Sequence, residues 1–246
     1  MPEGARQVVL RAGANAVKIL VAGHGGLVAM RSSRLRSRSM KTIHIRELDE
    51  SGSYKLISAA VTPRPIAWTA TLGPDGSVNL APYSSFTFIS YSPPKVLISI
   101  GPGNVALKDT LANVAKRGEF TVSSVTPELL QPMVDSSHTF AAEVSEAAAL
   151  DIALAPASVI ETPFVRDAAV AMECRLDRIV DVGDEHAHRL VIGDVVCFHV
   201  ADRLWQGDRI DAVAYASLGR IGGPLYVTRG EMLKAQISPH LKAEAS

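Results

Sequence analysis

Residues 66–90 read IAWTATLGPDGSVNLAPYSSFTFIS, and this stretch decides the fold class. Within 66–72 every second residue falls on one face, so that Trp68 and its apolar neighbours lie opposite two threonines, which is the period of a β-strand. GPDG at 73–76 supplies a turn, because its proline fixes one backbone angle and its second glycine closes the turn. The chain returns in SVNLA and continues in SFTFIS. Two strands joined by a tight turn and followed directly by a third predict an antiparallel sheet.

The rest of the chain after residue 40 also reads mainly as β-structure. KVLISIG (95–101) is rich enough in Val, Leu and Ile for a strand buried on both faces, and longer strands are expected at 169–180 and 188–200. Short helices are expected in three places: within 104–118, after Thr126, and at 141–150. Many strands with few, short helices predict a single-domain β-barrel that carries helical insertions.

Charge is unevenly distributed along the chain. Lys plus Arg and Asp plus Glu each total 25, yet residues 1–40 contain seven basic residues and one acid, Glu3. The remainder is therefore acidic, which is unlike a nucleic-acid-binding surface. The sequence contains no stretch of 18 uncharged apolar residues, so no transmembrane helix is expected.

The basic segment 1–40 contains an apparent nucleotide motif. VKILVAGHGG (17–26) resembles a strand that runs into a phosphate-binding loop, but Val28 stands where the third glycine should fall, and no helix-like segment follows. The Arg- and Ser-rich, acid-poor composition is typical of an organelle transit peptide, and it also fits residues upstream of a working start at Met40. We favour the second interpretation and expect a disordered or loosely helical leader at 1–40, followed by one domain at 41–246.

The sequence offers little for metal-based or nucleophilic catalysis. His186 and His188 have ligand-like spacing, but their position at a strand entrance favours a solvated turn over a metal site. Cys174 and Cys197 have no CxxC spacing and fall in predicted strands, which indicates inert thiols in a reducing compartment. No serine lies in a GxSxG elbow. We therefore predict no catalytic side chain and no metal, and any enzymatic chemistry would come from a cofactor.

Six segments, taken in order, resemble one family. A plain core strand would not place a proline, a tyrosine and two serines side by side, as NLAPYSSF (79–86) does. With its flanking segments, this stretch resembles the flavin reductase-like, FMN-binding split-barrel proteins, which include flavin reductases and flavoredoxin-type proteins. The resemblance covers most of 41–246 and rests on PRPIAWTAT (63–71), DGSVNLAPYSSF (75–86), SPPKVLISIG (92–101), KDTLANVAKRGEFTV (108–122), MECRLDRIV (172–180) and GRIGGPLY (219–226).

The resemblance implies a mainly β fold with short helices, a split β-barrel of Greek-key type, with FMN bound between the subunits of a homodimer. The implied cofactor-binding residues form three groups: Trp68, Thr69, Ala70 and Thr71 for the ribityl chain and ring; Pro82, Tyr83, Ser84 and Ser85 along the ring edge; Lys108, Asp109 and Thr110 for the phosphate. Because a proline interrupts the strand ladder, backbone N–H groups beside it stay available for a ligand. A lysine at a helix N-terminus suits an anion.

From this resemblance we predict an FMN-dependent oxidoreductase that takes hydride from NAD(P)H and delivers electrons to free flavin, a small molecule or a redox protein. The alternative is an FMN-binding electron-transfer protein, flavoredoxin-like, which a protein partner reduces without NAD(P)H. A cofactor-free binding protein on the same barrel is a third reading, because fold does not fix function. NADH and NADPH both fit, as do tightly bound and exchangeable FMN. We expect a cytoplasmic homodimer that binds neither nucleic acid nor membranes.

Overall fold

The computed structural model describes residues 6–12, 15–21, 40–102, 109–141, 144–183, 188–230 and 232–233. The chain divides into two units, residues 1–48 and 49–246. In the first unit, strand β1 (Arg6–Ala12) pairs antiparallel with β2 (Asn15–Val21), and a 3-10 turn, η1, follows at Ile45–Glu47. A hairpin thus stands where a disordered or loosely helical leader was expected, because both segments are rich in Val, Leu and Ile, which favour extended backbone.

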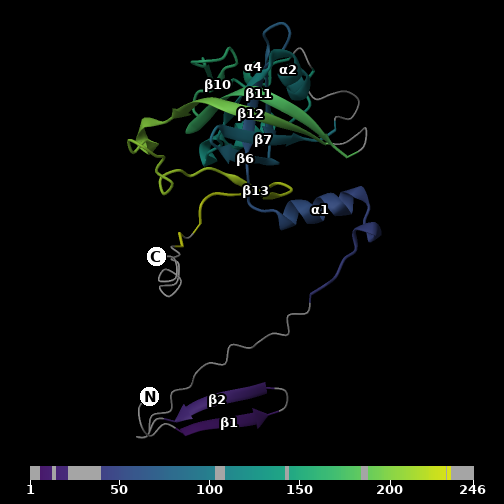
Figure 1. The fold of residues 1–246 in the computed structure, drawn as a ribbon, viewed down its shortest axis with the longest axis vertical. Helices are drawn as coiled ribbons and strands as arrows, with labels where there is room; N and C mark the ends of the chain where they lie inside the picture. The colour runs from purple at the N-terminus through teal and green to yellow at the C-terminus, as the bar shows by residue number, and fades with distance from the viewer. Residues whose placement is uncertain are drawn as a thin grey trace. The chain divides into compact units, whose positions relative to one another are not determined.

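A seven-stranded antiparallel sheet forms the second unit (Figure 1). Its strand order is β5-β4-β8-β11-β12-β7-β6. Strands β4 and β8 are neighbours in the sheet although three strands separate them in sequence, a crossover typical of Greek-key connections. The strands are β4 (Ala67–Leu72), β5 (Val78–Tyr83), β6 (Phe86–Tyr91), β7 (Pro94–Ile100), β8 (Glu119–Ser123), β11 (Val170–Val182) and β12 (His188–Val200).

The two edge strands of this sheet, β5 and β6, follow one another in sequence with only Ser84 and Ser85 between them. Three peptide steps span at most about 11 Å, so the opposite edges of the sheet must lie close together and the sheet must curl into a barrel. In the described part of the chain β5 pairs with β4 and β6 pairs with β7, but the two edges do not pair with each other. The barrel wall is therefore split between β5 and β6, which confirms the predicted fold class.

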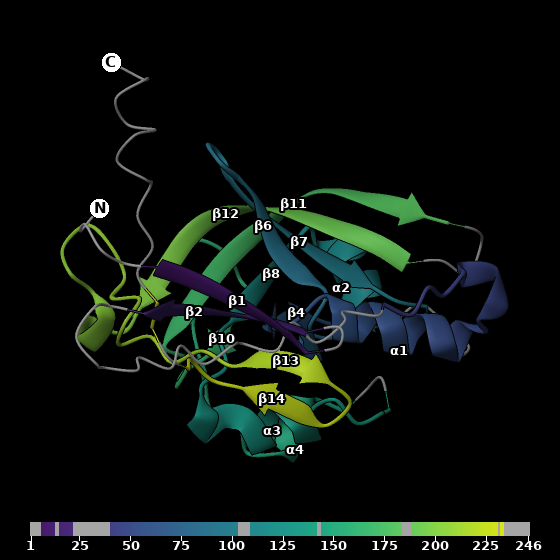
Figure 2. The same cartoon turned by 90° about the horizontal axis from the view of Figure 1, so that it is seen from below.

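Short helices and small sheets cover the barrel. Helix α1 lies beside β13 (Figure 1), and Figure 2 shows α3 and α4 on the side of the β13–β14 hairpin. No helix in the described ranges is long and apolar enough to cross a membrane. The helices are α1 (Glu50–Ala60), α2 (Asp109–Arg117), α3 (Leu130–Asp135), α4 (Glu146–Ala149) and the 3-10 turns η2 (Pro127–Leu129) and η3 (Asp202–Leu204). The short strands are β3 (Arg64–Pro65), β9 (Leu154–Ala155), β10 (Phe164–Val165), β13 (Gly219–Gly222) and β14 (Leu225–Val227).

Strand β4 is buried on both faces because it lies between two apolar clusters. Ala67 belongs to the cluster inside the barrel, around Phe120. Trp68 and Ala70 belong to a second cluster, which packs under α3 and around Met133. The alternation read from the sequence is thus correct, but the threonine face is as dry as the tryptophan face.

The expectation that the strand at 95–101 is buried on both faces is wrong. In β7 the alternate residues Val96, Ile98 and Ile100 are buried, whereas the residues between them are partly exposed. On that second face the Lys95 ammonium lies 2.5 Å from a carboxylate oxygen of Asp194 and forms a second ion pair at 3.2 Å. The partial exposure of this face, including the charged Lys95, shows that water reaches it, so β7 carries one dry face only.

Glu173 of β11 anchors a long loop to the barrel. Its fully buried carboxylate accepts hydrogen bonds from the N–H groups of Ser158, Val159 and Ile160 at 2.7, 2.8 and 3.0 Å, and Nε2 of His199 lies 2.6 Å away. Burial alone would raise the pKa of Glu173, but these hydrogen bonds outweigh it and lower the pKa. The ionised side chain therefore stabilises the fold.

We predict that Glu173→Gln lowers the free energy of unfolding by about 2 kcal/mol at pH 7, because hydrogen bonds to a charge become bonds to a neutral amide. Since the folded-state pKa is lowered, this stabilisation is present above about pH 4.3, the ordinary glutamate pKa, and is lost as the pH falls below it. Urea unfolding at pH 7 and pH 3.5 measures both effects. The control Glu161→Gln changes a side chain of the same loop that is 78% exposed. A Glu173→Gln protein as stable as the wild type at pH 7 would contradict the assignment.

Candidate functional site

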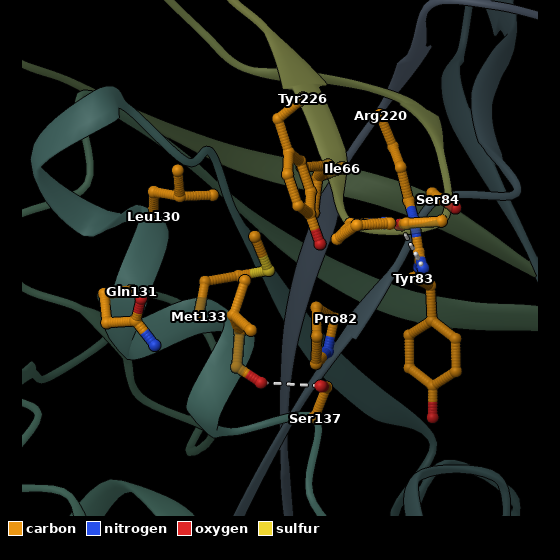
Figure 3. Close-up of a pocket in the computed structure, with 13 residues that line it drawn as sticks. Ile66, Pro82, Tyr83, Ser84, Leu130, Gln131, Met133, Ser137, Arg220 and Tyr226 are labelled. Carbon is orange, nitrogen blue, oxygen red and sulfur yellow. Dashed lines mark hydrogen bonds between the residues drawn. The ribbon is translucent and has the colours of Figure 1, made fainter.

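A pocket of about 480 Å³ opens beside the split between β5 and β6. Figure 3 shows its walls, with α3 on one side and the end of β5 and the β13–β14 hairpin on the other. The lining combines apolar side chains with a few polar ones. It includes Ile66, Pro82, Tyr83, Ser84, Leu130, Gln131, Met133, Ser137, Arg220 and Tyr226.

Helix α3 is held in place by a tryptophan from the barrel wall. The indole Nε1–H of Trp68 donates to the Ser136 hydroxyl at 2.9 Å, and this hydroxyl donates to the Met133 carbonyl at 2.9 Å. Met133 is itself buried in the cluster under α3. One wall of the pocket is therefore fixed to β4 through buried groups.

Ser84 and Ser85 belong to neither strand ladder, because β5 ends at Tyr83 and β6 begins at Phe86. The Ser85 carbonyl accepts from the N–H of Ser99 at 2.8 Å. Within the described ranges, the N–H groups and hydroxyls of both serines have no protein partner. Ser84 is half-buried and lines the pocket, and Ser85 is exposed. Two N–H and two O–H donors are thus available at the split.

Residues 68–71 lie away from this pocket. Trp68, Thr69, Ala70 and Thr71 are 0% exposed. The Thr69 hydroxyl donates to the carbonyl of Ala67 at 3.3 Å, and the Thr71 hydroxyl accepts from the side-chain amide of Asn113 on α2 at 3.1 Å. The structure therefore does not bring these four residues to the pocket surface, and their contact with a ribityl chain stays a prediction.

Tyr83 joins the pocket to α2. Tyr83 is among the residues that line the pocket, and its side chain reaches into the core cluster around Phe120. Its hydroxyl donates to the Thr110 hydroxyl at 2.8 Å, and the amide of Asn79 donates to the same oxygen at 3.3 Å. Burial raises the pKa of Tyr83 to about 12, so the phenol stays protonated at neutral pH. Thr110 is buried and its oxygen is engaged by β5, which makes it an anchor for the start of α2.

Of the three residues predicted to bind the phosphate, the structure describes two. Lys108 lies outside the described residues. Asp109 is exposed at the first position of α2, where an acid suits the helix dipole but repels a phosphate. The Asp109 charge also acts on the nearby Glu146. Burial raises the pKa of Glu146, a hydrogen bond from the Leu80 N–H at 2.8 Å opposes this rise, and the Asp109 charge adds to it. Phosphate binding at 108–110 therefore stays a prediction that depends on Lys108.

Arg220 and Tyr226 line the pocket but are not among the residues that the sequence predicts for the site, although their segment GRIGGPLY contributes to the family resemblance. Nε and Nη2 of Arg220 donate to the Gly223 carbonyl at 3.3 and 3.1 Å, and the guanidinium carbon lies 5.9 Å from the centre of the Tyr226 ring. An arginine and a tyrosine flanking a Gly-Gly-Pro turn are the sequence signal that could have indicated them. Their place beside Pro82 depends on long-range pairing of β13 with β3.

A second polar cluster lies elsewhere on the barrel. Glu173, Cys197 and His199 present ligand-type atoms within 4.8 Å of one another. The two oxygens of Glu173 already accept four hydrogen bonds, and the ring of Phe164 stacks on His199 with centroids 4.2 Å apart. Because its carboxylate is saturated, this cluster is explained as an anchor of the fold.

Residues 59–216 match the model of the flavin reductase like domain, and the chain belongs to that family. Nitrilotriacetate monooxygenase component B from Bacillus cereus is 31% identical, with a TM-score of 0.78 over 81% of this chain and 100% of that chain. The 2-nitrobenzoate 2-nitroreductase NbaA from Pseudomonas fluorescens is 30% identical, with a TM-score of 0.74 over 81% of this chain and 97% of that chain. A protein from Shewanella frigidimarina with a split barrel domain is 21% identical, with a TM-score of 0.68 over 79% of this chain and 96% of that chain. At this identity the similarity supports the fold alone.

The residues at the split fit the flavin that this family implies. The polar edge of an isoalloxazine presents carbonyl oxygens and a ring nitrogen, and the four available donors of Ser84 and Ser85 match such acceptors. The adjoining pocket offers an apolar wall that would exclude water from the ring. The groups at the split therefore have the chemistry that the ring end of a flavin requires.

Proposed function

We propose that the protein is an FMN-dependent oxidoreductase of flavin reductase type that takes hydride from NAD(P)H. The observation that carries the proposal is the set of available donors on Ser84 and Ser85, next to a pocket of about 480 Å³, in a member of the flavin reductase-like family. Two relatives of about 30% identity are described as a monooxygenase component and a nitroreductase, which supports redox chemistry.

The protein groups would bind and orient the cofactor. FMN, when bound, supplies hydride acceptance and onward electron transfer. Ser84 and Ser85 would donate to the polar edge of the ring and stabilise negative charge there. The apolar wall around Met133 would exclude water from the ring faces. No side chain is required as an acid or a base, and the phenol of Tyr83 keeps its proton at neutral pH because its pKa is about 12.

The remaining cofactor contacts belong to the same proposal. Lys108 would bind the phosphate through charge-assisted hydrogen bonds, with Asp109 and Thr110 at the helix start beside it. The ribityl chain would pass over the segment 68–71, and the side chains that now cover this segment would have to move. Free flavin, a small molecule or a redox protein would accept the electrons, in a cytoplasmic setting.

We also propose that two copies of the chain form a homodimer. Strand β6 exposes Phe88 and Tyr91, which are 71% and 89% accessible, and β12 exposes Phe198. Large apolar side chains so exposed on one barrel are typical of surfaces that another protein covers. Another copy of the chain is always present as a possible partner. A two-fold symmetric interface would bury the same exposed side chains on both copies.

Light scattering at micromolar concentration is expected to give twice the chain mass, and Phe88→Ser with Tyr91→Ser is expected to shift the protein to monomer, because the apolar surface that drives association is lost. Leu233→Ser serves as the control, since it removes an 84% exposed apolar side chain outside β6. A monomeric wild-type protein would contradict the dimer.

Anaerobic titration of the FMN-reconstituted protein with NADH and with NADPH tests the proposed activity. We expect the blue absorption band of the flavin to bleach rapidly with at least one nucleotide, because hydride transfer reduces the ring. A yellow protein that stays oxidised with both nucleotides would contradict NAD(P)H use and would favour an electron carrier reduced by a protein partner. A protein that takes up no FMN would contradict flavin binding itself.

A further inference from the structure

One charged side chain stands among the described residues that line the pocket, and it is Arg220. The other lining groups are apolar, aromatic or neutral polar. Figure 3 shows the arginine on the side of the pocket that Ser84 and Tyr226 share, opposite α3. A single cation in an otherwise uncharged cavity gives the cavity a preference for ligands that carry negative charge.

The guanidinium of Arg220 is held in place but not neutralised. Both of its bonds go to one carbonyl, that of Gly223, through Nε and Nη2. These bonds use two of its five N–H groups, so both N–H groups of Nη1 and one of Nη2 have no protein acceptor in the described part of the chain. No described carboxylate lies within ion-pair distance of it.

Two other polar side chains on the pocket wall, those of Gln131 and Ser137, are already engaged. The amide of Gln131 donates to the carboxylate of Asp135 at 2.7 Å, and the Ser137 hydroxyl donates to the Val134 carbonyl at 2.6 Å. Arg220 is therefore the group that retains several charge-bearing donors. Planar guanidinium groups bind carboxylates and phosphates through two parallel hydrogen bonds, so Arg220 has the geometry to hold a carboxylate.

The rest of the cavity suits a flat ring. Ile66, Leu130 and Met133 supply apolar surface, and the Tyr226 ring supplies a face for stacking. A ring with one carboxylate would place its anion at Arg220 and its ring among these side chains. We propose that the pocket binds small aromatic carboxylates and that Arg220 determines this specificity. The inference rests on the proposed function in one respect, namely that such a ligand would meet the flavin as its redox partner.

Binding of benzoate and benzamide to the FMN-reconstituted, oxidised protein tests the proposal. The two ligands have the same shape and differ in charge, and perturbation of the flavin spectrum or calorimetry gives each dissociation constant. We expect wild-type protein to bind benzoate at least about tenfold more tightly than benzamide, since charge-assisted hydrogen bonds favour the anion. Arg220→Gln should abolish this preference, with benzamide affinity changed by less than about twofold.

Two controls keep the result interpretable. Arg229→Gln removes the same charge from an exposed position outside the pocket, and it should keep the benzoate preference. Arg220→Lys keeps the charge and should keep part of the preference for benzoate. Thermal melting of both Arg220 variants shows whether either substitution disturbs the β13–β14 hairpin. Equal wild-type affinity for the two ligands, or a preference that survives in Arg220→Gln, would overturn the proposal.

The competing hypothesis is that the Arg220 guanidinium binds a phosphate of NADH or NADPH. If Arg220→Gln leaves benzoate affinity unchanged but raises the KM for NADH or NADPH about tenfold, Arg220 serves a nucleotide phosphate and the proposal is overturned. Benzoate binding is measured without electron transfer. Failure of the flavin to bleach with NAD(P)H therefore counts against the proposed reductase activity alone, while the benzoate preference still decides the role of Arg220.

Discussion

The two-residue link between β5 and β6 is the constraint on which the rest of the structure depends. These strands are the opposite edges of the seven-stranded sheet, and Ser84 and Ser85 alone connect them. A link this short forces the edges together without pairing them, so the sheet closes into a barrel with a split in its wall. The N–H groups of the two linking residues form no hydrogen bonds of the strand ladder. The short link that closes the barrel therefore also leaves donors available for a ligand.

The elements around the split are fixed by buried contacts. Trp68 ties α3 to the barrel through Ser136, and Tyr83 ties α2 to β5 through Thr110. Satisfied polar bonds in a dry interior are strong and leave few alternative arrangements. The pocket is thus built on a rigid frame, which is what a site that must orient a flat ring requires.

Most of the fold could be predicted from local patterns. The turn at 73–76, the two long strands and the end of α2 at Gly118, whose φ is +72°, follow from residue periodicity and glycine chemistry. The burial of β4 on both faces could not be predicted in the same way, because its second cover comes from α3, more than 50 residues away in sequence. The hairpin at 6–21 was missed because its basic residues indicated a disordered leader.

The site was predictable only where its residues are close in sequence. The two serines of NLAPYSSF lie at a break in the ladder beside the pocket. The expectation that Pro82 interrupts the ladder is wrong, because Pro82 pairs with Trp68 inside β5. Arg220 reaches the same place through the pairing of β13 with β3, a contact between segments about 155 residues apart that no local pattern reveals. Residues 68–71 have the right types for a ligand contact, but they lie in β4, which is buried between two apolar clusters.

Titration of the wild-type protein and of the double variant Ser84→Ala, Ser85→Ala with FMN, followed by quenching of the flavin fluorescence, tests the central claim most directly. If the split holds the flavin ring, the loss of two hydroxyl donors should weaken FMN binding about tenfold or more, since each neutral hydrogen bond contributes about 1 kcal/mol. Ser51→Ala, at an exposed position of α1, should bind FMN like the wild type. Unchanged affinity in the double variant would show that the flavin ring does not bind at the split.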